Sequence, residues 1–403
     1  MITVGRWVLV AVLTIHGRLH LLGVVKGFGW AQVAQLTHPV GAAAGSLWLI
    51  AALTVLACAA FLAAGAGTWW WALALFAAAV SQAAVVTSWD DARAGTIVNV
   101  VLVIAAMFGY ASAGPTSFHA QWAEQATAAI VDVDPTPPLV TEADLATLPQ
   151  PLAAYVRRCG AVGRPRVTSL LATFHGRIRS GPDQAWMPFT GGQVNTYGPR
   201  PQRAFIMDAT RFGLPVTVLH QFADARATMR VKLLSAVTLV DAAGPQMDRG
   251  ETVTVFNDLV VLAPGAIVGA PVRWTTIDTE HVHGVFTNGT QTVSAVLTFD
   301  AQHDLVNFRS EDRMRASADG KSFTAQTWST PLTHSDVAGG QQGQVVGQGQ
   351  WDAPPPQGLF TYVEYNVDSI AYNERSQVIT PGNPGAAAGV EHLGGQAPAG
   401  RSR

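Results

Sequence analysis

Two neighbouring apolar stretches decide the fold of the first part of the chain: "GTWWWALALFAAAVSQAAVVTSWDDARAGTIVNVVLVIAAMFGYASAG" (residues 67–114). The segments Trp69–Thr87 and Thr96–Ala113 each approach the roughly 20 residues that a helix needs to cross a bilayer core of about 30 Å. Three tryptophans begin the first segment and Trp89 follows its end, as in an interfacial aromatic belt. The pattern predicts two membrane-spanning helices joined by a short polar loop.

Two further apolar segments precede this stretch, Val4–Val25 and Ala42–Ala64. The first is unlike a signal peptide, because it contains Arg18 and two histidines and no small-residue cleavage site follows it. We therefore predict a transmembrane four-helix region over residues 1–114. Lys26 and Arg93 favour the first and third loops as cytoplasmic, so we expect an extracytoplasmic carboxy-terminal domain.

The composition fits a chain that is partly in a membrane and partly soluble. Of its 403 residues, 49% are hydrophobic and 13% are charged, and the net charge is −2. Without a basic stripe, no nucleic-acid partner is expected. The two cysteines, Cys58 and Cys159, lie far apart in the sequence and have no metal-type spacing. The chain lacks nucleophile-elbow, zinc-protease and phosphate-loop motifs, which argues against catalysis in the β-domain. We predict no cofactor.

The hydrophobic period changes along the rest of the chain. Residues 115–150 predict an amphipathic segment and a proline-rich linker, and residues 376–403, rich in Gly, Ala and Pro, predict a disordered tail. Residues 151–375 read as an antiparallel β-rich domain, with strands that include "ATMRVKLLSAVTLVD" (227–241) and "ETVTVFNDLVVL" (251–262). The predicted fold class is α+β: a four-helix transmembrane bundle followed by a curved antiparallel β-sheet domain with short helices packed on it.

Long motifs in both parts of the chain carry a family resemblance. They include "HGRLHLLG" (16–23), "SQAAVVTSWDDARAGTIVNVVLV" (81–103), "RAFIMDATRFGLPVTVLHQF" (203–222) and "VFNDLVVLAPGAIV" (255–268). Together they resemble an uncharacterised, domain-of-unknown-function family of bacterial membrane proteins with N-terminal transmembrane helices and a C-terminal β-rich domain. The resemblance implies a bacterial envelope protein and brings no catalytic residues. A curved sheet on a membrane anchor also resembles, by fold-level analogy alone, the lipoprotein-carrier architecture, which binds acyl chains.

A polar cluster interrupts the apolar segments. His16 and His20 are four residues apart and share one helix face. Such a pair can bind a metal or haem, can form polar contacts with Ser81, Gln82 or Asn99 inside the bundle, or can belong to a proton or substrate path. Helix capping is the alternative role for the loop carboxylates. The candidate membrane polar cluster comprises His16, His20, Gln82, Asp90, Asp91 and Arg93.

Two functions remain open for the β-domain. The first is binding of a lipid or another apolar molecule on the apolar sheet face, with polar contacts at its rim from Trp274, Asp278, Arg309 and Arg313. The alternative is a membrane enzyme or redox protein that uses the His16/His20 pair or an acid–base set of Asp278, His281 and Glu311. The expected partners are membrane lipids and an apolar small molecule, in a multi-pass protein of the cell membrane.

Overall fold

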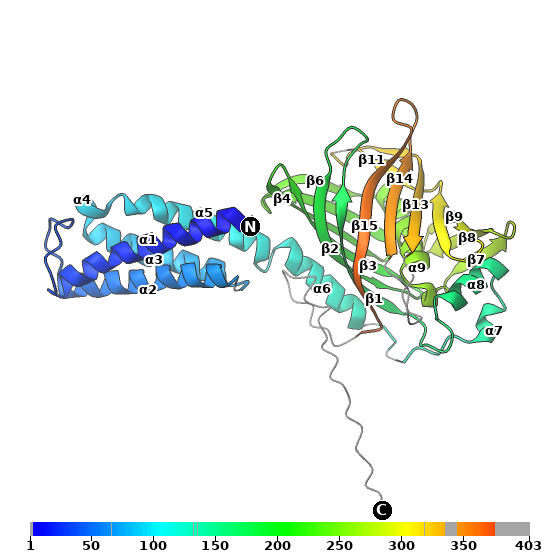
Figure 1. Cartoon of the computed structure of the whole chain (residues 1–403), viewed down its shortest axis with the longest axis horizontal. Helices are drawn as coiled ribbons and strands as arrows, with labels where there is room; N and C mark the ends of the chain where they lie inside the picture. The colour runs from blue at the N-terminus through cyan, green and yellow to red at the C-terminus, as the bar shows by residue number, and fades with distance from the viewer. Residues whose placement is uncertain are drawn as a thin grey trace, which may run out of the picture.

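The computed structural model describes residues 3–65, 67–131, 133–134, 136–317, 319–334 and 345–374 (Figure 1). It shows a bundle of helices, a large sheet, and one helix that joins them. The segment 376–403, predicted to be disordered, lies outside the described residues.

The bundle contains four helices that are long and apolar enough to cross a membrane. They are α1 (Thr3–Gly27), α2 (Ala42–Ala64), α3 (Trp70–Thr87) and α5 (Gly95–Ala113), with the short α4 (Trp89–Ala92) between the last two. Small residues let these helices approach closely, as is common in membranes. A Cβ added at Gly27 of α1 would lie 2.5 Å from the Cα of Gly45 in α2. The predicted four apolar helices are therefore confirmed.

Helix α6 (Phe118–Val131) leads from the bundle to the sheet (Figure 1). Its buried residues Phe118, Trp122, Ala126 and Ile130 recur every four positions, so one face of the helix is apolar. That face packs on the outer side of the sheet against Leu171, Val194, Ala204, Ile206 and Leu219. The helix lies where the sequence predicts an amphipathic segment.

The sheet has 13 antiparallel strands among the described residues, in the order β6-β5-β4-β3-β2-β1-β15-β14-β13-β10-β9-β8-β7. It is not closed, because β6 and β7 are its two edges. The predicted α+β fold with a curved antiparallel sheet is thus confirmed (Figure 1). The strands are β1 (Ser169–Ile178), β2 (Met187–Thr196), β3 (Gln202–Arg211), β4 (Leu214–Ala223), β5 (Arg226–Leu233), β6 (Val237–Ala243), β7 (Val272–Thr276), β8 (His281–Asn288), β9 (Gln291–Phe299), β10 (Leu305–Ser310), β13 (Thr327–His334), β14 (Val345–Asp352) and β15 (Leu359–Tyr372).

Short helices pack against this sheet. They are α7 (Glu142–Leu145), α8 (Gln150–Arg158) and the 3-10 helix η1 (Pro264–Ala266). A reciprocal capping box of Thr141 and Asp144 starts α7. Helix α8 buries Leu152 and Tyr155, and the Tyr155 hydroxyl donates a hydrogen bond to the carbonyl of Val260 at 2.9 Å.

One predicted strand, residues 251–262, is wrong: residues 251–261 belong to helix α9 (Pro245–Val261), and Leu262 caps its end. This helix lies on the inner, concave side of the sheet and almost all of its second half is buried. Because it is buried on every side, its apolar residues show no helical period, and a β-branched run then imitates a strand. Pro245 at the helix start is the sequence feature that still indicates a helix here.

Candidate functional site

The concave side of the sheet is divided into two parts. Helix α9 fills one part, where Phe256 and its neighbours form the main core with strands from both ends of the sheet. The other part is a second cluster, none of whose described members belongs to α9. We call it the inner apolar surface; its buried members are Phe174, Phe189, Met207, Ala209 and Val216, and its half-buried members are Ile178, Phe205, Val218, Val231, Leu233, Val363 and Tyr365.

Strand alternation places these side chains on one face. Phe205 and Met207 alternate along β3, and Val218 and Val231 lie opposite one another on β4 and β5. Glycine makes room for the largest rings: a Cβ at Gly191 would lie 2.5 Å from the ring of Phe174. Aromatic rings and branched aliphatic side chains therefore line a continuous stretch of the concave face.

A cluster of charged residues separates this surface from α9. Arg203 on β3 and His220 on β4 face Glu251 and Asp258 on the helix; we call these four residues the buried ion cluster. The Arg203 guanidinium donates to Glu251 Oε1 and to Asp258 Oδ2, both at 2.8 Å. The side chains of Glu251 and Arg203 are only 1% and 7% exposed. Charges buried this deeply persist only when they are paired and hydrogen-bonded.

Two amides complete the hydrogen bonding of the cluster. Asn195 and Gln193 of β2 donate to Asp258 Oδ2 at 3.0 and 3.2 Å, and Arg203 donates to Gln193 Oε1 at 3.1 Å. The second oxygen of Glu251 lies 3.1 Å from Nε2 of His220. Neither of those two atoms makes a hydrogen bond within the described part of the chain. They are in ion-pair contact with one another but have no well-aligned hydrogen-bond partner among the described residues.

Burial sets the protonation states of the cluster. It lowers the pKa of His220 to about 4, so this imidazole is neutral near pH 7. Burial alone would raise the pKa of Glu251, but His220, which is protonated at the acidic pH where a carboxyl titrates, and the guanidinium groups of Arg203 and Arg313 outweigh it and hold that pKa below its usual value. Burial raises the pKa of Asp258 above its usual value, although Arg203 and Asn195 counteract it. With Arg313 included, two guanidinium groups face two acidic side chains.

The buried ion cluster touches the inner apolar surface directly. The Arg203 guanidinium lies 4.5 Å from the ring centroid of Phe205. Arg313 hydrogen-bonds to Thr254 of α9 and stacks on the ring of Trp328 at 4.3 Å. A molecule on the inner apolar surface would therefore have apolar contacts along most of its length and charged groups at one end.

A small hairpin crosses the concave side. Its strands are β11 (Met314–Ala316) and β12 (Phe323–Ala325), and it follows β10. At its turn, a Cβ on Gly320 would lie 2.6 Å from Val240 on the edge strand β6. Arg315 of the hairpin donates to the carbonyl of Ser180, after β1, at 3.0 Å. The hairpin thus spans from β10 to β6 over the concave side.

The four predicted rim residues do not form one site. Arg313 reaches the buried ion cluster, and Trp274 packs on Phe256 of α9 at 5.7 Å between ring centroids. Asp278 is exposed and bonds His281 next to its own turn. Arg309 is also exposed and pairs with Glu311 at 2.8 Å. Of the four, only Arg313 and Trp274 touch the interior of the concave side.

The histidines of α1 meet polar side chains of α3 and α5. Ser81 Oγ lies 3.0 Å from Nε2 of His16 and 2.8 Å from Nε2 of His20, and it donates to Asn99 Oδ1 at 2.7 Å. Asn99 in turn donates to Gln82 at 2.9 Å. The structure therefore brings His16, His20 and Gln82 into one network, which we call the bundle network.

The loop residues of the candidate membrane cluster lie elsewhere. Asp91 accepts hydrogen bonds from the hydroxyl and backbone of Thr37, both at 2.7 Å, and these lower its pKa to about 2. This carboxylate ties α4 to the loop between α1 and α2. Asp90 and Arg93 are not joined to the bundle network by any hydrogen bond or ion pair in the described ranges.

The alternative acid–base set is not assembled. Asp278 and His281 are paired at 2.9 Å. Glu311 instead bonds Thr327 and Arg309. The register places Arg309 opposite Val296, and Val296 opposite His283, so β10 carries Glu311 away from His281. Within the described residues, no group of three His, Cys, Asp or Glu side chains could hold a metal ion.

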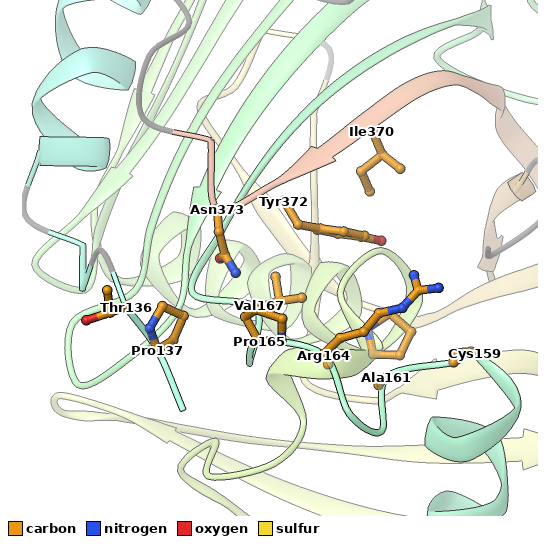
Figure 2. A pocket seen from close by; sticks show the side chains of 13 residues that line it. Thr136, Pro137, Cys159, Ala161, Arg164, Pro165, Val167, Ile370, Tyr372 and Asn373 are labelled. Atoms are coloured by element: carbon orange, nitrogen blue, oxygen red, sulfur yellow. The ribbon is translucent and has the colours of Figure 1, made fainter. Parts of the chain in front are cut away.

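Two surface cavities of about 660 and 550 Å³ lie at the end of the sheet where the linker passes. Figure 2 shows the larger one, with Arg164, Tyr372 and Asn373 at its wall. Its polar groups are engaged: Tyr372 donates to the carbonyl of Leu262 at 2.6 Å, and Asn373 bonds the backbone of Thr168 at 2.8 Å. Burial raises the pKa of the Cys159 thiol there to about 12, so it is no nucleophile at neutral pH.

Sequence reasoning missed the buried ion cluster. Its residues are 55 or fewer positions apart but lie on three separate elements. The available signal was a charged residue inside an otherwise apolar run, as in "RAFIM" for Arg203 and "VFNDLVV" for Asp258. Reading residues 251–262 as a strand hid the helical spacing that aims Glu251 and Asp258 at the same guanidinium.

Comparisons with known proteins identify one family and similarities to solved structures. A search of curated proteins gave no match. The chain is similar to a putative outer membrane lipoprotein-sorting protein domain from Vibrio parahaemolyticus (11% identity, TM-score 0.29, 55% of this chain and 91% of that one). It is also similar to a LolA superfamily protein from Nitrosomonas europaea (11%, 0.29, 56% and 96%) and to a DUF1329 family protein from Desulfovibrio piger (11%, 0.24, 55% and 91%). The model of a family of unknown function, DUF6544, matches residues 138–365, more than half of the chain, and the chain therefore belongs to that family.

Proposed function

We propose that this protein is a multi-pass membrane protein whose β-domain binds a lipid or another apolar molecule on the inner apolar surface. The observation that carries the proposal is the division of the concave side. Helix α9 fills one part as an ordinary core, while Phe205, Val218, Val231 and Leu233 remain half-buried in the other. Binding sites for apolar ligands are concave and mainly apolar, with few polar groups that fix orientation.

The buried ion cluster gives such a molecule a polar end. Glu251 Oε2 and His220 Nε2 form an ion-pair contact but have no well-aligned hydrogen-bond partner among the described residues, and they lie at the border of the inner apolar surface. Arg203 and Arg313 lie beside them. We infer that the ligand is amphipathic, with an acyl or similar chain along the strands and a polar group directed to the cluster.

The domain arrangement follows from the same proposal. The four-helix region of residues 1–114 would hold the protein in the membrane, residues 115–150 would connect it, and residues 151–375 would form the binding domain, ahead of the tail at 376–403. Lys26 and Arg93 are at the end of the bundle away from the sheet, and Arg6 is at the near end, where it bonds the carbonyl of Ala63. By the positive-inside rule the binding domain would be extracytoplasmic.

The test compares two tryptophan substitutions in the full-length protein purified in mild detergent. Val218→Trp adds a large ring to the inner apolar surface, whereas Thr190→Trp adds the same ring to the exposed outer face of β2. Native mass spectrometry then measures the co-purifying lipid. We expect wild type and Thr190→Trp to retain it, and Val218→Trp to lose at least about 90% of it, since a bulky side chain occupies the space of the ligand. Equal retention in all three proteins would contradict the proposal.

A further inference from the structure

Three hairpin turns of the sheet share one unusual backbone geometry. Two consecutive residues have left-handed φ angles in each: Phe212 (51°) with Gly213, Leu234 (53°) with Ser235, and Asp224 (50°) with Ala225. Such turns favour Asn, Asp and Gly at these positions, because a side chain there crowds the backbone. The turn between β4 and β5 follows that preference with Asp224.

The other two turns depart from this residue preference, because each has a large apolar residue at the first left-handed position. Phe212 joins β3 to β4 and is 86% exposed, and Leu234 joins β5 to β6 and is 37% exposed. The Phe212 ring contacts the guanidinium of Arg211 at 5.6 Å, a weak interaction at so exposed a site. The backbone at Phe212 is thus held in a strained conformation, and the exposed ring makes few contacts that would offset the strain.

Contacts with α6 show which way these two turns point. His119, in the first turn of α6, lies 2.8 Å from Asp208 of β3, and Trp122, one turn later, donates to the carbonyl of Ala204. Moving along β3 from 204 to 208 therefore leads back to the start of α6 and so toward the bundle. Phe212 lies four residues, or about 13 Å, further in that direction. Figure 1 shows the ends of β4 and β6 on the side of the sheet facing the bundle.

The bundle presents aromatic side chains at the same end. Trp69 stacks on Trp71, and Trp71 meets Tyr110 edge to face with 4.9 Å between ring centroids. Tyr110 lies in the last turn of α5, and α6 begins only a few residues later at Phe118. Tryptophan and tyrosine gather where a bilayer meets water. This level of the molecule is therefore where a membrane surface is expected.

Basic residues accompany the apolar turns. Lys232 of β5 lies 4.6 Å from the ring centroid of Phe118. Arg211 is exposed beside Phe212. Among the acids of these strands, Asp208 pairs with His119, and Asp241 lies opposite Arg230 in the strand register. Arg211 and Lys232 place two cations near the turns, and the surface of an anionic bilayer attracts such residues.

We propose that these two turns dock the β-domain onto the surface of the bilayer that holds its own helices. The docking rim consists of Phe212, Leu214 and Leu234, which enter the boundary between headgroups and acyl chains, and of Arg211 and Lys232, which contact anionic headgroups. This inference rests on the proposed membrane insertion and goes beyond ligand binding. With the rim docked, the end of the inner apolar surface at Val216 and Leu233 lies against the bilayer. An acyl chain could then enter this surface without crossing water.

The test places a dye next to the rim in the full-length protein. A Cys159→Ala background leaves Cys58, which is fully buried, as the remaining native thiol. An environment-sensitive dye is attached at Thr210→Cys beside the rim, at Asp224→Cys at the far end of the same hairpins, or at Ile104→Cys, which is 61% exposed in the middle of α5. The proteins are reconstituted in phosphatidylcholine–phosphatidylglycerol vesicles that contain nitroxide-labelled lipid.

We expect the lipid quencher to act strongly at positions 104 and 210 and several-fold less at 224. Phe212→Asp gives the near turn the residue that the far turn already uses, so the fold is kept, and quenching at 210 should fall to the value at 224. Charge reversal by Arg211→Glu with Lys232→Glu should lower the docked population by at least about fivefold. Both effects would support docking through the rim.

Three results would overturn the inference, each in a recognisable way. Quenching at 104 but not at 210 would reject the docking rim and leave membrane insertion intact. No quenching at 104 would reject membrane insertion and docking together. A signal at 210 that follows protein density rather than quencher lipid would mean that a second copy of the chain covers the rim.

Discussion

Two polar networks are buried in this molecule, and they differ in how they are built. The bundle network joins His16, His20, Ser81 and Asn99 through neutral hydrogen bonds of 2.7–3.2 Å. The buried ion cluster joins full charges, with Arg203 between Glu251 and Asp258. A neutral network loses only hydrogen bonds when one member is removed, whereas an ionic one leaves an unpaired charge away from water. The two networks should therefore respond very differently to single substitutions.

The largest effect is expected at Arg203. Replacing it by Met leaves two buried carboxylates without their common partner, which should lower the free energy of unfolding by about 3–5 kcal/mol. Chemical unfolding of the full-length protein in detergent measures this. Arg203→Met together with Glu251→Gln and Asp258→Asn should recover part of the loss, because the charges disappear together. A loss below about 1 kcal/mol in the single variant would mean that the cluster is hydrated rather than buried.

A pH dependence of intermediate size is expected at His220. Its pKa is about 4 in the folded protein against 6.5 in an unfolded chain, so between these values only the unfolded chain binds the proton. Stability should therefore decline as pH falls from about 6.5 to 4, by about 3 kcal/mol. His220→Phe should remove that part of the slope. Identical slopes for the two proteins would show that burial does not depress this histidine.

A smaller effect is expected in the bundle. Asn99→Ala removes the acceptor of Ser81 and the donor to Gln82, and polar contacts between membrane helices contribute about 0.6 kcal/mol on average. We expect a loss of about 1 kcal/mol in the same unfolding measurement. Ser112→Ala is the control, because that hydroxyl bonds the carbonyl of Gly109 in its own helix. If Asn99→Ala cost as much as Arg203→Met, the contrast between the networks would be lost.

The smallest effect is expected at an exposed ion pair of the sheet. Arg177 and Glu364 meet at 2.6 Å, but their side chains are 52% and 32% exposed. Water already solvates both groups, so Arg177→Met should change stability by no more than about 0.5 kcal/mol. This variant is the exposed reference for Arg203→Met, because the Arg177–Glu364 and Arg203–Glu251 pairs have similar distances and differ in burial.

The comparison also explains what could be predicted from sequence. The apolar helices, the period-two strands and the His16/His20 face follow from local spacing, so all three could be predicted. Glu251 and Asp258 could not be assigned, because α9 is buried on every side and its sequence carries no helical period. Asp278 and Arg309 were plausible rim residues by type, yet Asp278 lies in the turn between β7 and β8, and both side chains are exposed. Which face of a strand lies inside a curved sheet depends on pairings that sequence spacing does not contain.

Photocrosslinking tests the central proposal, apolar binding on the inner surface, most directly. Full-length protein is reconstituted with a lipid that carries a diazirine on its acyl chain, irradiated, digested and mapped by mass spectrometry. We expect adducts on Phe205, Val218, Val231 or Val363, inside the concave side, in addition to those on the membrane helices. Val218→Trp should abolish the inner adducts, and Thr190→Trp should leave them unchanged. Adducts confined to the helices and the docking rim would show that the inner apolar surface holds no lipid and would refute apolar binding there.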